Sequence, residues 1–210
     1  MSKRRFVSIG AMVVVAFVIC ISNVTAADYL LNVNSALTTD DPLFKGLEVF
    51  KKNVEAKSNG KITVKLFPSS QLGKDEDVLE QARAGAPVAV VVDGGRLAVF
   101  EKELGVLGAP FLASGYGGIR KVVTSDRFEE MVKKLHDSSG LQILSFNWWQ
   151  GERHLLTKKP ISGPADLKGI RMRTPGAPVW METIKAMGAT PAPMGWTEVY
   201  SAIQQKVIDG

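Results

Sequence analysis

The sequence predicts an α/β fold, in which helices alternate with the strands of a mainly parallel sheet. Over the first third of the chain, strand and helix patterns alternate in the order β-α-β-α-β. Residues 88–92 form a continuous apolar run of strand length, which is typical of a buried parallel strand. Six of the ten prolines lie between Pro160 and Pro193. This change of composition predicts that the chain enters a second lobe near residue 150.

The elements of the first lobe follow from local patterns. Asp41 and Pro42 are a typical N-cap and first helical residue, and apolar residues follow them at helical spacing. Alternating apolar residues predict a strand over 62–66, which Pro68 ends. The other expected elements are a strand over 29–33, helices over 74–84, 117–123 and 126–135, and a strand over 141–148.

The second lobe is expected to contain short strands over 152–157, 170–173 and 190–192, with helices over 179–187 and 197–206. This part has about 60 residues, which is too few to form a complete hydrophobic core of its own. The chain ends at Asp209-Gly210, a pair that usually turns the chain into a further segment. The sequence therefore predicts a fragment of a longer protein.

The N-terminus has the pattern of a secretory signal peptide. Lys3, Arg4 and Arg5 precede an apolar run over 6–21, and small residues surround Ala26. Cleavage is expected after Ala26. A membrane anchor is the alternative, but a run of 16 residues is shorter than the ~20 that span a bilayer. No later run approaches that length. We therefore expect an exported protein that is not embedded in the membrane, and a Gram-negative periplasm fits best.

Removal of the signal peptide changes the charge and the cysteine content. The formal net charge falls from +5 to +2, and Cys20, the single cysteine, is lost. No thiol nucleophile, thiolate metal site or disulfide is then available. A nearly balanced charge without a long basic stripe also argues against a nucleic-acid partner.

Residues for catalysis are sparse. His136 and His154 are the only histidines, and neither lies in a metal-ligand spacing or beside an obvious nucleophile. The acidic pair Asp75-Glu76 is expected to be solvated on a helix face. Residues 115–118 (GYGG) lack the Lys-Ser/Thr of a phosphate loop. We therefore expect no enzyme activity, no cofactor and no metal site.

Arginine and tryptophan residues near the second lobe indicate a pocket for a small organic anion. Arg171 and Arg173 alternate with apolar residues, so they share one face of a predicted strand. The planar fork of an arginine grips a carboxylate with two parallel hydrogen bonds. Arg153 lies on another predicted strand. In this interpretation, the four tryptophans form the apolar walls of the pocket. In the alternative interpretation, the arginines are surface residues of the strands and the tryptophans belong to the hydrophobic core. The tryptophans are Trp148, Trp149, Trp180 and Trp196.

The chain resembles the extracytoplasmic solute-binding proteins of TRAP transporters, the DctP-like family that binds dicarboxylates and sialic acid. The resemblance covers residues 27–210, and it is the order and spacing of the matching stretches that make it specific. These stretches are 61–73 (KITVKLFPSSQLG), 160–161 (PI) with 164–175 (PADLKGIRMRTP), 188–191 (GATP) and 198–210 (EVYSAIQQKVIDG).

The resemblance implies a two-lobe periplasmic-binding-protein architecture that closes around its ligand like a flytrap. The lobes would comprise residues 27–150 and 151–210, joined by crossing strands and a long helix. It also implies that the protein delivers an organic acid to the small and large TRAP membrane subunits. These subunits use an ion gradient to drive uptake. The family continues past Asp209-Gly210, so the second lobe is expected to be incomplete.

The resemblance also implies roles for individual residues. The family's signature arginine corresponds to Arg173, which would clamp the ligand carboxylate, and its second binding arginine corresponds to Arg153. An aromatic that lines the pocket corresponds to Trp196. Asp93 corresponds to a polar residue after the third strand, and Trp149 lies where an aromatic near the hinge faces the ligand.

Other functions remain open at this stage. Ala36 and Gly176 stand where sialic-acid binders have asparagines, which argues against that ligand. A binding protein of an ABC importer shares the two-lobe design but not the arginine-centred motifs. A ligand sensor for a signalling receptor would also fit. A secreted hydrolase would need a pairing of nucleophile and base, against which the two isolated histidines argue.

Overall fold

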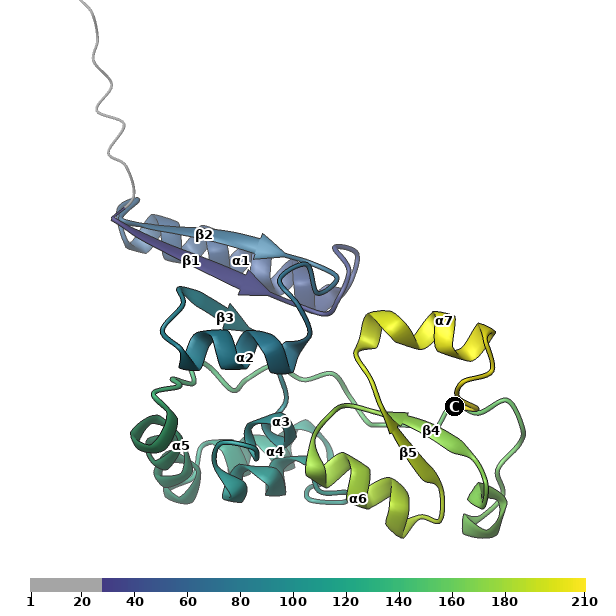
Figure 1. The fold of residues 1–210 in the computed structure, drawn as a ribbon. Coiled ribbons are helices and arrows are strands. Elements are labelled where there is room, and N and C mark those ends of the chain that lie inside the picture. The colour runs from purple at the N-terminus through teal and green to yellow at the C-terminus, as the bar shows by residue number, and fades with distance from the viewer. Residues whose placement is uncertain (1–27) are drawn as a thin grey trace, which may run out of the picture.

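The computed structural model describes residues 28–210, so the expected signal peptide falls outside the described residues. Two parallel sheets organise the chain (Figure 1). The first sheet has the strand order β2-β1-β3, and the second pairs β4 with β5. The expected α/β fold is confirmed. No helix within the described residues is long and apolar enough to cross a membrane.

The first sheet has its earliest strand at the centre. β1 pairs in parallel with β2 on one side and with β3 on the other, and Leu31 lies opposite Val64. The expected β-α-β-α-β order is confirmed, although the third strand is shorter than the apolar run that predicted it. The elements are β1 (Tyr29–Asn34), α1 (Pro42–Lys57), β2 (Ile62–Phe67), α2 (Asp75–Arg83) and β3 (Val88–Val90).

α1 begins where the sequence predicts. The Asp41 carboxylate accepts a hydrogen bond from the backbone N–H of Leu43 at 2.8 Å, and Pro42 takes the first helical position. Phe44 and Leu47 of this helix are buried against the sheet, where they pack with Val64 and its neighbours. The helix therefore covers one face of the first sheet.

A second group of helices forms the largest core. α5 begins at a Ser125 cap that accepts from the N–H of Phe128, and Gly140 ends it with a φ of +74°. Its apolar face includes Met131 and Leu135, which pack against the residues of α2 and α3. These elements are α3 (Gly94–Leu97), the 3₁₀ helix η1 (Lys102–Gly108), α4 (Gly115–Val123) and α5 (Asp126–Ser139).

A long connecting segment, residues 140–163 (the connector), leads from α5 to the elements of the second sheet (Figure 1). The small core of this sheet contains Leu167, Met172, Ile184 and Ala189. The expected strands over 170–173 and 190–192 are present to within two residues. The elements are η2 (Pro164–Leu167), β4 (Arg171–Thr174), α6 (Pro178–Ala186), β5 (Thr190–Pro193), η3 (Trp196–Glu198) and α7 (Val199–Gln204).

Two expected strands are wrong. Residues 141–148 and 152–157 form no regular element in the structure. A β-strand needs a neighbour to satisfy its backbone groups, and within the described residues no neighbouring strand hydrogen-bonds to either segment. Leu144 and Leu156 are therefore left exposed at 65% and 80%. An alternating apolar pattern in the sequence does not show whether a neighbouring strand is present to pair with the segment.

Truncation of Leu47 tests the packing of α1 against the first sheet. Leu47 is 3% exposed, whereas Val49 on the same helix is 59% exposed. We expect Leu47→Ala to lower the free energy of unfolding by about 2–5 kcal/mol because it leaves a cavity. Val49→Ala should change it by less than about 0.5 kcal/mol. Equal midpoints of urea unfolding for the two variants would contradict this packing.

Candidate functional site

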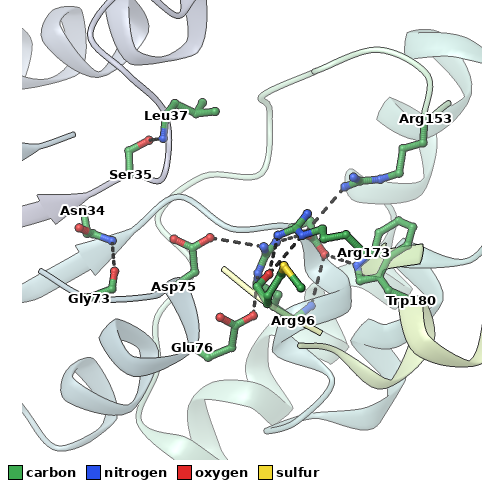
Figure 2. A network of polar contacts seen from close by, with 12 residues as sticks. Asn34, Ser35, Leu37, Gly73, Asp75, Glu76, Arg96, Arg153, Arg173 and Trp180 are labelled. Atoms are coloured by element: carbon green, nitrogen blue, oxygen red, sulfur yellow. Dashed lines mark hydrogen bonds and ion pairs between the residues drawn. The ribbon is translucent and has the colours of Figure 1, made fainter. Parts of the chain in front are cut away.

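The candidate site lies at the carboxyl ends of β1 and β3, where open α/β sheets commonly bind ligands. Asn34, at the end of β1, is fully buried and holds the loop that leads into α2. Its side chain accepts from the N–H of Leu72 at 3.1 Å and donates to the carbonyl oxygen of Gly73 at 3.3 Å. This contact fixes the start of α2, and with it Asp75 and Glu76 (Figure 2).

Arg96 of α3 lies at the centre of the site and contacts three carboxylates. Its Nε donates to Oε1 of Glu76 at 3.0 Å, and its Nη2 lies 3.5 Å from Oδ2 of Asp75. Its Nη1 pairs with Asp93, the N-cap residue of the same helix. The Arg96 side chain is only 12% exposed. Burial opposes its charge, but Asp93, then Asp75 and Glu76, outweigh burial and raise its pKa.

Asp75 is a buried carboxylate that is only half satisfied. It is 7% exposed, and within the described residues its Oδ1 has no hydrogen-bond partner. Burial raises the pKa of Asp75 from its usual value of 3.8 to about 6, although Arg96 opposes this shift. An unpaired buried acceptor is costly unless a donor reaches it. The expectation that Asp75-Glu76 is a solvated pair is therefore wrong for Asp75.

Asp93 connects the two lobes. Its Oδ1 accepts a hydrogen bond from Nε1 of Trp180, in α6, at 3.1 Å. The guanidinium carbon of Arg153 lies 4.1 Å from the centroid of the Trp180 ring, in a cation–π contact. Arg153 Nη2 also lies 3.9 Å from Oδ2 of Asp93. Gly95 permits this approach, because a Cβ there would lie 2.9 Å from Trp180 Nε1.

Arg173 is half-buried on β4 and is held differently from Arg96. Its Nε and Nη2 donate to the carbonyl oxygen of Met194 at 3.2 and 2.9 Å. Its guanidinium carbon lies 5.5 Å from the Trp196 ring centroid. Burial, followed by the like charge of Arg96, lowers the pKa of Arg173. Among the described residues, no carboxylate forms an ion pair with it.

An ion pair joins the lobes at a second point. Lys74, which precedes α2, places its Nζ 2.6 Å from Oε1 of Glu198 in η3. Both side chains are about half exposed, so the pair contributes little to stability by itself. Together with the hydrogen bond between Trp180 and Asp93, this ion pair makes a second contact between elements of the first and second lobes.

Four of the five residues predicted to bind ligand lie in this region, namely Arg173, Arg153, Trp196 and Asp93. The fifth, Trp149, lies in the exposed connector, where its ring packs edge-on against Tyr116 at a centroid distance of 6.2 Å. The binding roles of all five stay predictions. Within residues 28–210, no group of three His, Cys, Asp or Glu side chains is arranged to hold a metal ion.

Sequence reasoning missed three residues of the site. Arg96 and Asp75 were not proposed because their burial depends on residues distant in the chain. Trp180 was named only as one of four possible walls. A signal was available in the sequence: Asp93 and Arg96 are three residues apart and follow shortly after the apolar run that forms β3. This places both of them at the carboxyl edge of the sheet.

The comparisons with known proteins define the class of the molecule. Residues 33–210 match the DctP family, described as bacterial extracellular solute-binding protein, family 7. The chain belongs to this family, as the sequence resemblance predicts.

Curated relatives extend beyond the part of the family that this chain covers. The C4-dicarboxylate-binding periplasmic protein DctP of Rhodobacter capsulatus is 30% identical, over 88% of this chain and 55% of that protein. The ectoine/5-hydroxyectoine-binding periplasmic protein UehA of Ruegeria pomeroyi is 33% identical, over 77% of this chain and 47% of that protein. The chain spans about half the length of the curated relatives it matches.

Solved structures confirm the fold. An apo, open TRAP periplasmic solute-binding protein from Escherichia fergusonii is 49% identical, with a TM-score of 0.69 over 86% of this chain and 60% of that chain. One from Ochrobacterium anthropi, with bound L-fuconate, is 38% identical with a TM-score of 0.82, over 87% and 60% of the two chains. One from Actinobacillus succinogenes, with bound L-galactonate, is also 38% identical, with a TM-score of 0.83 over 86% and 60%.

The raised pKa of Asp75 predicts a specific pH dependence. Between pH 3.8 and about 6 the folded protein holds the Asp75 proton more tightly than the unfolded chain does. This contribution to stability is complete below pH 3.8 and is lost as the pH rises through about 6. Between about pH 3.5 and 7.5, the free energy of unfolding of Asp75→Asn should therefore rise relative to that of wild type by roughly 3 kcal/mol.

Urea unfolding at a series of pH values measures this difference. Asp77→Asn, which changes an exposed carboxyl group in the same helical turn, is the matched control and should follow the wild-type profile. If the free energies of unfolding of Asp75→Asn and wild type changed with pH in parallel, the raised pKa of a buried Asp75 would be contradicted.

Proposed function

We propose that the complete protein captures a carboxylate-bearing organic acid between its two lobes and delivers it to the membrane subunits of a TRAP transporter. The observation that carries this proposal is Arg173, a half-buried arginine that no carboxylate among the described residues neutralises. Arg96 nearby has three carboxylate partners. A ligand carboxylate would give Arg173 a negatively charged acceptor that balances its charge, as Asp75, Glu76 and Asp93 do for Arg96.

The chemistry of Arg173 suits this role. A guanidinium fork binds a carboxylate with two parallel charge-assisted hydrogen bonds. Such bonds are worth ~1.5–3 kcal/mol net, and more in a water-poor cleft. Arg153 is the second arginine of the proposed site and would adjust its stacking on Trp180 to reach the ligand. Trp196 supplies an aromatic wall beside Arg173. Trp149 would reach the ligand only if the connector moved.

The surrounding acidic groups favour a polyhydroxylated monocarboxylate, such as a sugar acid. Asp75, Glu76 and Asp93 present acceptor oxygens on the first-lobe side of the site, and Asp75 Oδ1 is unpaired. Ligand hydroxyl groups can donate to such oxygens, whereas a second ligand carboxylate would be repelled. The relatives solved with L-fuconate and L-galactonate are consistent with this ligand class.

Transport rather than catalysis is the proposed outcome of binding. The matched relatives are solute-binding proteins, and several of them are named as periplasmic. The proposal includes export by the signal peptide, cleavage after Ala26, a periplasmic location and lobes over 27–150 and 151–210. Genes for small and large TRAP membrane subunits beside this gene would support it. An ATPase gene would instead favour an ABC importer, and a receptor gene would favour a ligand sensor.

Substitution of Arg173 tests the carboxylate clamp. In the complete protein, Arg173→Ala should weaken the binding of a sugar acid at least about tenfold, which corresponds to ~1.4 kcal/mol. Arg173→Lys should also weaken it, because a point charge does not reproduce the fork. Arg83→Ala removes an exposed arginine at the end of α2 and serves as the control. Calorimetry that gives the wild-type affinity for Arg173→Ala would rule out the clamp.

The proposed ligand class can be tested by thermal shift. We expect L-galactonate or L-fuconate to stabilise the complete protein more than succinate or malate does. A ligand at 100 times its Kd adds ~2.7 kcal/mol to the free energy of unfolding. Stronger stabilisation by the dicarboxylates would show that the acidic groups do not select against a second carboxylate.

A further inference from the structure

We propose that the ion pair between Arg171 and Asp209 positions Arg173, which makes Asp209 a positioning residue for ligand capture. The inference rests on the proposed function of Arg173 and adds a residue that lies outside the ligand site. It starts from the different environments of two arginines on the same short strand.

The side chains of Arg171 and Asp209 form a two-pronged contact. Nε of Arg171 donates to Oδ2 of Asp209 at 2.9 Å, and Nη2 donates to Oδ1 at 3.0 Å. Oδ2 also accepts from the backbone N–H of Arg171 at 3.1 Å. The hydrogen bond from the Arg171 side chain is the main reason that the pKa of Asp209 falls to about 2. The pair is therefore ionised at any pH where the protein would work.

Arg171 is therefore not available to a ligand. Its Nη2 donates also to the carbonyl oxygen of Lys206 at 2.7 Å. Of the two arginines on β4, Arg173, two residues further along, is the one whose guanidinium has no carboxylate partner within the described residues. The sequence placed both arginines on one face of the strand, but the structure gives them different partners.

The same contact adds a short extended segment to the edge of β4. The backbone N–H of Asp209 donates to the carbonyl oxygen of Arg171 at 2.9 Å, and that of Arg173 donates to the carbonyl oxygen of Gly210 at 2.7 Å. On its other side, Asp209 accepts from the N–H of Lys158 at 3.0 Å. Ile208 is fully buried and anchors the segment. Residues 209–210 thus lie between β4 and the connector.

Arg173 is held from both edges of its strand. On one edge it lies opposite Ala192 of β5, and its guanidinium donates to Met194. On the other edge its backbone N–H depends on Gly210, whose place is fixed by the preceding Asp209. A shift by one residue would turn side chains to the opposite face of the sheet. The pair between Arg171 and Asp209 fixes this register and so fixes where the Arg173 fork points.

The experiment is a double-mutant cycle on ligand affinity in the complete protein. The probe is L-galactonate, or whichever sugar acid of the thermal-shift panel stabilises most. Asp209→Asn should raise the Kd by about fivefold in the wild-type background. In the Arg173→Lys background, which already lacks the fork, the same substitution should change the Kd by less than about twofold. Glu182→Gln, which breaks the exposed pair of Glu182 with Lys185 in the same lobe, is the matched control.

The outcomes separate a positioning role from a structural one. Equal weakening by Asp209→Asn in both backgrounds, or no weakening in either, would overturn the inference. If Asp209→Asn does not fold, Arg171→Lys takes its place in the same cycle, because it keeps the charge and removes the fork. An unchanged affinity for Arg173→Ala would instead refute the proposed function itself, so the two failures are distinguishable.

Discussion

The carboxylate of Asp93 is the contact on which the arrangement of the site depends. It caps α3, pairs with Arg96 of the same helix and accepts a hydrogen bond from Trp180 in the second lobe. One side chain thus sets the start of a helix, balances a buried charge and links the first lobe to α6 of the second. The ligand-lining role predicted for Asp93 stays a prediction, and the contacts that the structure gives it are contacts within the protein.

The four arginines near the second lobe differ in how their positive charge is balanced. Arg96 has three carboxylate partners, and Arg171 has a two-pronged contact with Asp209. Arg153 stacks on Trp180. Only Arg173 of these four donates its side-chain hydrogen bonds to a neutral backbone carbonyl alone, within the described residues. A positive charge balanced in this way is suited to an anionic ligand.

The elements that the sequence predicted correctly are those with local signals. Asp41-Pro42 starts α1, and Gly140 ends α5 because it adopts a positive φ. The strands expected over 141–148 and 152–157 failed because a strand requires a partner that local alternation does not provide. Asp75 was misjudged for a related reason. Asp75 is buried beside Arg96, which lies 21 residues further along the chain. The two residues come together only because the sheet places α2 next to α3.

The central claim is that Arg173 receives the ligand carboxylate. A crystal structure of the complete protein with bound L-galactonate tests this most directly. We predict carboxylate oxygens within about 3 Å of the Arg173 guanidinium, with ligand hydroxyl groups directed at the first-lobe acidic residues. A ligand whose carboxylate lies elsewhere, while Arg173 still donates only to Met194, would contradict the account.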